Sequence, residues 1–330
     1  MAIDLTRLPA PAVIESLDYE TLLAQYKAKL LQLAPAELRD SLAASLQLES
    51  ESLTLFLELA AYLDLLQRQR INEAAKASLL AYATGADLDN RAADYGVQRL
   101  LIEPANLDVN PPTEAIWESD DALRSRAQMA LEGLSVAGSR GAYAFHALRA
   151  SGDIAGTFID SPTFRAITMA PAIAAQLPAG AIVLSCDYAA GLDHPLPGDV
   201  SIAVLPRQGV TGADLPARVE QLLRDDDIRP ITDRPRALLG QPTRFEVDAR
   251  LELEHGPDIE VVQRAARSSL DALLANIRKL GGEVARSALY GALHVQGVRR
   301  VDLRAPADDI RCDGQHYPEC GAVRLARVDA

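Results

Sequence analysis

Cys312, His316 and Cys320 form the one group in this sequence whose residue types and spacing could hold a metal ion. Thiolate and imidazole are ligands that zinc prefers, but a structural site needs a fourth ligand, and its cysteines usually stand closer together, as in Cys-x2-Cys. Asp313 and Glu319 are the nearest candidates for that ligand. Two interpretations stay open: a zinc site, which would support a zinc-dependent enzyme or a zinc-stabilised adaptor, and a surface loop with incidental cysteines, which we favour.

Other catalytic patterns match poorly. The segment Gly133-Leu-Ser-Val-Ala-Gly138 misses the Gly-x-Ser-x-Gly nucleophile elbow by one position, and it is expected to join helix to helix instead of strand to helix. Neither a Gly-x-x-x-x-Gly-Lys-Ser/Thr phosphate loop nor a Gly-x-Gly-x-x-Gly fingerprint occurs, and the five histidines are scattered. The sequence therefore predicts no catalytic residue, no cofactor, no bound metal and no enzyme.

The elements that would position functional residues begin with helices over the first hundred residues. Asp18 can cap a helix that runs to about Leu33, and Pro35 stands where the first turn of a second helix tolerates proline. From about Glu51 a third helix is predicted to run to Gly85, a rod of roughly 50 Å that the glycine would close as a left-handed cap.

Within this rod, the segment from Leu53 to Leu66 contains only three clearly polar residues, Thr54, Glu58 and Asp64. At 100° per residue these three fall within about 120°, so more than half of the circumference is apolar. Either the chain's own N-terminal bundle buries this surface, or partner chains cover it. In the second case the contact residues would be Leu53, Phe56, Leu57, Ala60, Leu63 and Leu66.

Beyond the rod, a proline-rich connector from Ile102 to Thr113 is unsuited to a helix or a central strand. Two central helices are expected next, from about Asp120 to Leu131 and from Ser139 onward, with glycines crowding the turn between them. After them the pattern changes to short strands with a returning helix, at Ile154–Ile159, Ile182–Ser185, Val200–Leu205 and Asp214–Leu223.

The C-terminal part shows the clearest strand period. From Arg244 to Glu254 apolar and charged residues alternate without exception, which predicts a sheet with one wet face. A helix from Pro257 to Gly281-Gly282, a shorter helix and a final strand are expected to follow, the last two at Ser287–His294 and Val298–Leu303.

These patterns together predict an α+β protein, with a helical N-terminal region built around a long, bundle-forming helix and followed by two small α+β domains. The predicted domains are residues 1–100, the helical bundle region; residues 101–235, the central helices and the first α+β domain, with a Pro/Gly-rich insertion near 161–198; and residues 236–330, the C-terminal α+β domain.

Four arginines, Arg124, Arg126, Arg140 and Arg149, lie around the turn between the two central helices. They can pair with nearby Asp and Glu of the same chain. Alternatively, Arg124, Arg126 and Arg140 are interface residues, because the planar fork of arginine suits carboxylates of a partner chain.

Composition restricts the partners. The net charge of −13 argues against binding a phosphate backbone or an anionic membrane surface. A run of 14 apolar-rich residues in the rod is too short for a bilayer span, which requires about 20. Three cysteines are an odd and sparse set that fits a reducing cytoplasm, and the first residues lack the pattern of a secretory signal.

The stretch from Glu118 to Tyr143 resembles the most recognisable segment of the baseplate J family. A charged opening, Glu118-Ser-Asp-Asp, leads into a helix and then into the turn Gly133-Leu-Ser-Val-Ala-Gly-Ser-Arg-Gly-Ala-Tyr143. Further segments fit the family in the same order, so that the resemblance covers nearly the whole chain: Leu8–Asp18, Leu48–Glu51, Gln69–Ala75, Asp87–Asp89, Tyr95–Val97, Asp227–Arg234 and Ser287–Val298. Ser161–Gly198 departs from the family because it is longer and richer in proline and glycine.

The resemblance implies a structural subunit of the baseplate wedge in a contractile tail, either of a phage or of a tailocin such as an R-type pyocin. The implied partners are a second copy of the chain, a tail protein I-type wedge partner, adjacent wedges in a hexameric ring, and the sheath-initiating and spike or hub proteins, with no nucleic acid and no membrane insertion. Such a subunit would assemble in the cytoplasm of the bacterial host and help to couple receptor binding to sheath contraction.

Overall fold

A computed structural model of the chain describes residues 11–134, 138–174, 176–178, 180–226, 228–254 and 259–328. The chain separates into two compact units, Met1–Gln98 and Arg99–Ala330. The positions used above that lie outside the described residues are 8–10 of the opening motif, 135–137 of the near-elbow, Asp227 and Pro257.

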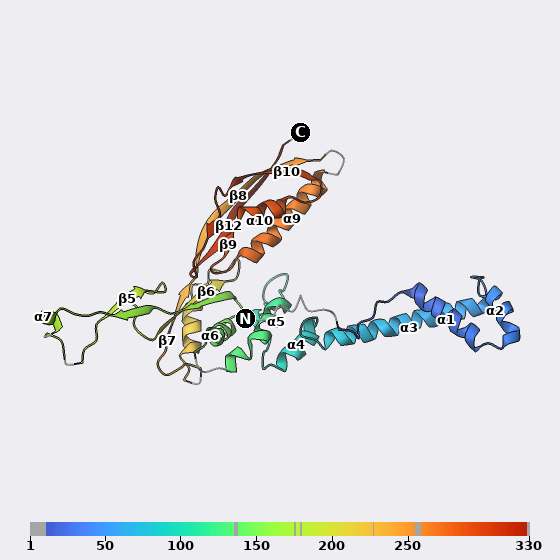
Figure 1. Cartoon of the computed structure of the whole chain (residues 1–330), viewed down its shortest axis with the longest axis horizontal. Helices are drawn as coiled ribbons and strands as arrows, with labels where there is room; N and C mark the ends of the chain where they lie inside the picture. The colour runs from blue at the N-terminus through green and yellow to red at the C-terminus, as the bar shows by residue number, and fades with distance from the viewer. Residues whose placement is uncertain are drawn as a thin grey trace. The chain divides into compact units, whose positions relative to one another are not determined.

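The first unit is helical (Figure 1), with α1 at Tyr19–Leu33, a 3-10 turn at Ala36–Leu38, α2 at Arg39–Ser45, α3 at Ser52–Ala77 and α4 at Gly85–Ala93. The prediction that one rod runs to Gly85 is wrong. The chain turns after Ala77, the amide of Tyr82 donating to the carbonyl of Leu79, and Gly85 begins α4 with a φ of +52°. The turn buries Ala83 and the inner side of α4, and this burial favours two helices over a continuous one.

The second unit begins with an antiparallel hairpin of β1, Leu101–Glu103, and β2, Ile116–Trp117, which the bridge between Asn106 and Thr113 extends. The connector thus forms a hairpin, and its prolines keep it out of a larger sheet. The two central helices follow as α5, Asp120–Met129, and α6, Arg140–Arg149, with a 3-10 turn at Glu132–Leu134 between them.

A three-stranded sheet follows, in the order β3-β6-β7. Its strands are β3, Ile154–Asp160, β6, Asp199–Pro206, and β7, Arg234–Leu239; β6 is antiparallel to β3 and parallel to β7. Tyr143 and Ala147 of α6 and Val219 and Leu223 of α8, Leu215–Leu223, pack on Ile202 and Val204 of β6 to form the core.

The insertion near 161–198 forms a two-stranded antiparallel ribbon of β4, Thr163–Ala166, and β5, Leu184–Tyr188, with the short helix α7, Pro171–Ala174, between the two strands. The strand predicted at Ile182–Ser185 is therefore shifted towards the C-terminus, and it pairs only with β4 in the described structure. A pattern of alternating residues does not reveal which strand lies next to it.

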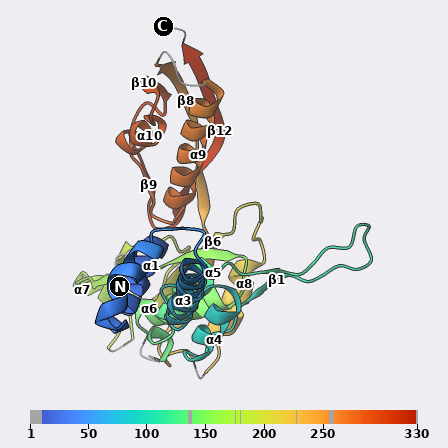
Figure 2. The same cartoon turned by 90° about the vertical axis from the view of Figure 1, so that its right-hand side faces the viewer.

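The C-terminal part is built on β8, Gln241–Leu253, whose inward residues are buried in the predicted alternation. Strand β10, Val298–Ala305, pairs with one side of β8 and β12, His316–Val328, with the other. Helices α9, Ile259–Ile277, and α10, Arg286–Leu293, cover one face of this sheet (Figure 2). The short strands β9, Glu283–Val284, and β11, Ile310–Arg311, pair with each other.

The expectation of a surface loop around Cys312, His316 and Cys320 is correct for Cys312, which lies between β11 and β12, and wrong for His316 and Cys320, which belong to β12. A bulge at Gly321 interrupts the two-residue period of this strand, which hides it in the sequence. Strand β12 runs parallel to β8, whose paired residues lie about 75 positions earlier, so local pattern alone cannot predict the pairing.

The predicted α+β class is confirmed. The division of residues 101–330 into two domains at 235 stays a prediction. No helix in the described ranges is long and apolar enough to cross a membrane.

Candidate assembly interface

The packing of α1 against α3 determines which side of α3 is exposed. Leu22 and Leu23 of α1 meet Ala61 of α3 in a small core, and Ala61 is completely buried. Tyr26, Leu57 and the other half-buried residues complete this contact. A helix contributes one stripe to a neighbour, so α1 covers one side of α3 and leaves the other side exposed.

The exposed side carries an apolar surface that we call the α3 stripe. Its side chains are between 43% and 73% exposed, and they form three pairs whose members stand seven residues apart, the spacing of a seam between packed helices. At 100° per residue, the six positions span about 120° of the circumference. The stripe consists of Leu55, Phe56, Leu59, Tyr62, Leu63 and Leu66.

The polar residues of the same segment lie on the covered side. Thr54 is 1% exposed, and its hydroxyl has no hydrogen-bond partner among the described residues. Asp64 is half-buried and pairs with Arg68 at 3.0 Å. Burying an unpaired hydroxyl while exposing six large apolar side chains is unfavourable for a chain alone in water. The α3 stripe is therefore the candidate contact surface.

The residues predicted for this interface divide between the two sides of α3. Phe56, Leu63 and Leu66 belong to the stripe, Leu53 and Ala60 are half-buried beside it, and Leu57 packs towards α1. Sequence reasoning missed Leu55, Leu59 and Tyr62. The seven-residue spacing from each of them to another stripe position could have identified them.

The first part of the signature stretch contains a buried ion pair between Glu118 and Arg126, which we call the clamp. The carboxylate of Glu118 accepts from Nε of Arg126 at 2.8 Å and from the terminal nitrogen at 2.6 Å, and both side chains are about 5% exposed. The same carboxylate accepts from the backbone amide of Leu100 at 3.1 Å, and Arg99 donates to the Glu118 carbonyl at 2.6 Å. Arg126 therefore holds the start of the second unit together, and the prediction that it is an interface residue is wrong because its side chain is buried.

The glycine-rich turn after α5 packs just as closely. A Cβ atom on Gly133 would lie 2.2 Å from the ring of Phe145, so only glycine fits at that position. Tyr143 is buried and donates to Asp233 at 2.8 Å. Burial, together with this hydrogen bond, raises the pKa of Tyr143 above its usual range, so the phenol stays protonated. Gly133 and Tyr143, on either side of this turn, therefore serve packing.

Two other arginines around this turn, Arg124 and Arg140, also have partners in the chain. Arg124 pairs with Asp121 at 2.8 Å, and Arg140, which is 77% exposed, lies 3.4 Å from Asp160. A solvent-exposed pair of this kind is worth at most about 1 kcal/mol. A role for Arg124 and Arg140 in an interface stays a prediction.

The cysteine and histidine group does not converge on one point. His316 contacts Asp313 at 2.6 Å, and the thiol of Cys320 lies 3.6 Å from the carbonyl of Ala322. Burial raises the pKa of the Cys320 thiol, which disfavours the thiolate that zinc requires. In the described part of the chain, no three His, Cys, Asp or Glu residues are placed to hold a metal ion, so the zinc alternative gains no support.

Comparison with known proteins completes this picture. The model of the baseplate J-like N-terminal domain matches residues 49–106, which include α3 and α4, and that of the baseplate J-like protein C-terminal domain matches residues 245–326. Baseplate protein J of Escherichia phage P2 is 40% identical over 325 residues, covering 98% of this chain and 97% of that protein. The chain belongs to the baseplate J family. It is a structural baseplate protein, and the resemblance carried by the signature stretch is confirmed.

One solved structure, the cryo-EM structure of the anti-feeding prophage baseplate, is also similar. It matches with a TM-score of 0.35 and 15% identity, over 63% of this chain and 44% of that chain. A similarity this low adds nothing to the argument for the α3 stripe.

Proposed function

We propose that this chain is a wedge subunit of a contractile-tail baseplate, and that its α3 stripe packs into a helical bundle with a second copy of the chain and a tail protein I-type subunit. The observation that carries the proposal is the apolar stripe on the side of α3 that faces away from α1. A seam with this spacing is complementary to further amphipathic helices.

The second unit would extend the assembly. In this proposal its C-terminal part contacts adjacent wedges in a hexameric ring around the spike or hub proteins, and sheath-initiating proteins bind to the ring. The ring forms in the bacterial cytoplasm and transmits receptor binding to the sheath. The chain acts through its contacts and not as an enzyme, because its most distinctive residues serve packing.

The variant Leu63→Asp tests the bundle. Leu63 is 56% exposed, so the isolated variant should unfold within about 0.5 kcal/mol of the parent protein. In the assembled wedge the carboxylate would be buried, at a cost of several kcal/mol. Co-expression with the other tail proteins, followed by affinity capture of the chain, should therefore recover no wedge complex.

Ile71→Asp is the matched control, since Ile71 lies on the same helix, is 50% exposed and is not part of the stripe. It should still form wedges. Recovery of contraction-competent particles with Leu63→Asp would contradict the proposal. The variant Leu57→Asp is unsuitable for this test, because Leu57 packs towards α1 and its substitution would disturb folding.

A further inference from the structure

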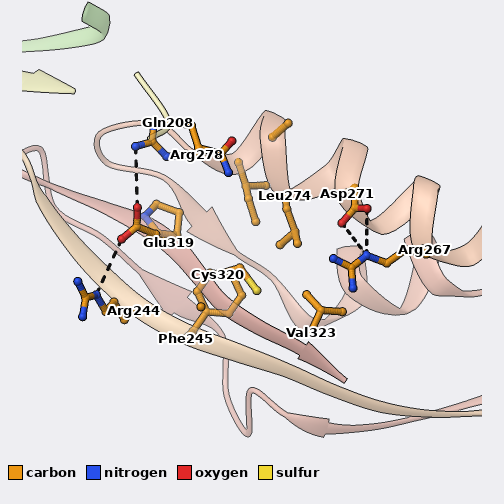
Figure 3. A pocket seen from close by; sticks show the side chains of 14 residues that line it. Gln208, Arg244, Phe245, Arg267, Asp271, Leu274, Arg278, Glu319, Cys320 and Val323 are labelled. Carbon is orange, nitrogen blue, oxygen red and sulfur yellow. Dashed lines mark hydrogen bonds and ion pairs between the residues drawn. The ribbon is translucent and has the colours of Figure 1, made fainter. Parts of the chain in front are cut away.

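A groove of about 590 Å³ lies between α9 and β12 in the C-terminal part of the chain (Figure 3). Its walls are side chains of α9 from Arg267 to Ile277, Arg278 just after the helix, and residues of β12 from Pro318 to Val323. Leu274, Phe245 and Val323 supply its apolar middle. The groove belongs to the second unit and shares no residue with the α3 stripe.

Strand β12 is the edge of its sheet. It pairs with β8 from His316 to Val328, and no other strand of the described structure pairs with it. An edge strand presents backbone N–H and C=O groups that can pair with another chain. The groove and the open edge lie side by side, which is the arrangement that accepts an extended peptide by strand addition.

The dimensions of the two walls agree. From Arg267 to Ile277, its last residue, α9 takes ten steps of 1.5 Å and is about 15 Å long. From Pro318 to Val323 the strand takes five steps of about 3.3 Å, about 16 Å in all. The groove therefore fits roughly five residues of extended chain.

The charges at one end of the groove indicate which charged group the bound segment carries. Arg244 and Arg278 share a single carboxylate, that of Glu319, at 3.9 Å and 4.0 Å. Arg278 is 13% exposed and also donates to the carbonyl of Pro206 at 2.9 Å, whereas Arg244 is 81% exposed and open to a further partner. Two guanidinium groups for one carboxylate leave a net positive charge, and arginine favours a second carboxylate as its partner. The other end is balanced, because Arg267 pairs with Asp271 at 3.0 Å.

We propose that this groove binds an extended segment of another baseplate polypeptide, which adds as a strand to β12, places an apolar side chain over Phe245 and Leu274, and directs a carboxylate to Arg244 and Arg278. The inference rests on the proposed function only for the source of the partner. It names a contact beyond the helical bundle.

Hydrogen exchange in the full-length chain tests this proposal. Amide exchange of Glu319–Val323 and the flanking residues is measured in the purified chain and in purified intact baseplates. Strand addition should slow the outward-facing amides of β12 at least tenfold in the baseplate. Equal exchange in the two samples would overturn the proposal.

A pair of charge reversals adds a second readout. Arg244→Glu should restore fast exchange in β12 of the assembled particle, because it repels the carboxylate of the bound segment. Arg324→Glu, on the same strand pair but outside the groove, should leave the protection unchanged. If the two variants behave alike, the carboxylate part of the proposal is wrong.

The outcomes of this test and of the Leu63→Asp test distinguish a failure of the groove proposal from a failure of the bundle proposal. If wedges form with Leu63→Asp and β12 is still protected in particles, only the bundle proposal fails. Where Leu63→Asp blocks assembly but β12 of parent particles exchanges freely, only the groove proposal fails.

Discussion

At the scale of single residues, the strongest polar contacts of this protein hold its backbone together. Glu118 binds Arg126 through two hydrogen bonds and also receives the amide of Leu100. At the start of the sheet, the fully buried carboxylate of Asp199 receives Arg234 at 2.5 Å and Arg236 at 3.3 Å. Burial alone would raise the pKa of Asp199, but the amide of Leu196 and the two guanidinium groups hold it below its usual value.

The clamp at Glu118 leads to a prediction at this scale. Glu118→Ala leaves the Arg126 charge buried without its carboxylate, so the free energy of unfolding should fall by about 3–5 kcal/mol. The double variant Glu118→Met/Arg126→Met removes both charges and should recover a large part of that loss, since an apolar pair of similar volume avoids the desolvation penalty. Urea unfolding of the three proteins measures both effects. A double variant as unstable as Glu118→Ala would show that the charges are not what matters.

At the scale of elements, helices of this chain are fitted to close neighbours. Helix α1 approaches α3 over Ala61, and the turn before α6 brings Gly133 against Phe145. Small residues at these points allow backbone and ring to meet, and larger ones would force both elements apart. Small side chains at these contacts therefore position the elements as much as large side chains do.

Gly133→Ala tests this fit. The added methyl would lie 2.2 Å from a ring that is itself 8% exposed and cannot swing into solvent, so the variant should lose about 1–3 kcal/mol of stability. Gly291→Ala in α10 is the matched control, because nothing lies within 4 Å of its added methyl. This control should be neutral or gain up to about 1 kcal/mol. Similar losses in the two variants would contradict the steric explanation.

At the scale of the whole molecule, the core clusters of the described residues differ in size. The cluster between α1 and α3 contains only Leu22, Leu23 and Ala61 as buried residues, while two larger clusters lie on the two sheets of the second unit. Apolar burial is the main source of folding stability. The pair of α1 and α3 therefore gains stability when the α3 stripe packs against other chains.

This difference predicts the order of unfolding. Trp117, the single tryptophan, belongs to β2 of the second unit, so its fluorescence follows that unit. Far-UV circular dichroism follows the helices of both units. In urea, the isolated chain should lose part of its helical signal before the Trp117 signal changes, because the smaller core unfolds first. Coincident transitions would show that the units unfold together.

The sequence alone predicted the α+β class, the positions of α1, α5, α6, α8, α9 and α10, and the family. Helical spacing and strand alternation are local properties, so Leu22 and Leu23 in α1 or Phe245 to Leu253 in β8 reveal their elements directly. The signature stretch could also be recognised from the sequence, because its glycine and charged residues stand at fixed positions.

The tertiary structure alone decided which side of each element is covered. The apolar circumference of α3 was visible in the sequence, but only the placement of α1 shows that Thr54 faces inward and Phe56 outward. The burial of Arg126 depends on Glu118, and the edge position of β12 depends on its parallel pairing with β8. Each of these features depends on contact with a residue in another element. The order of residues within one element does not show which other element will lie next to it.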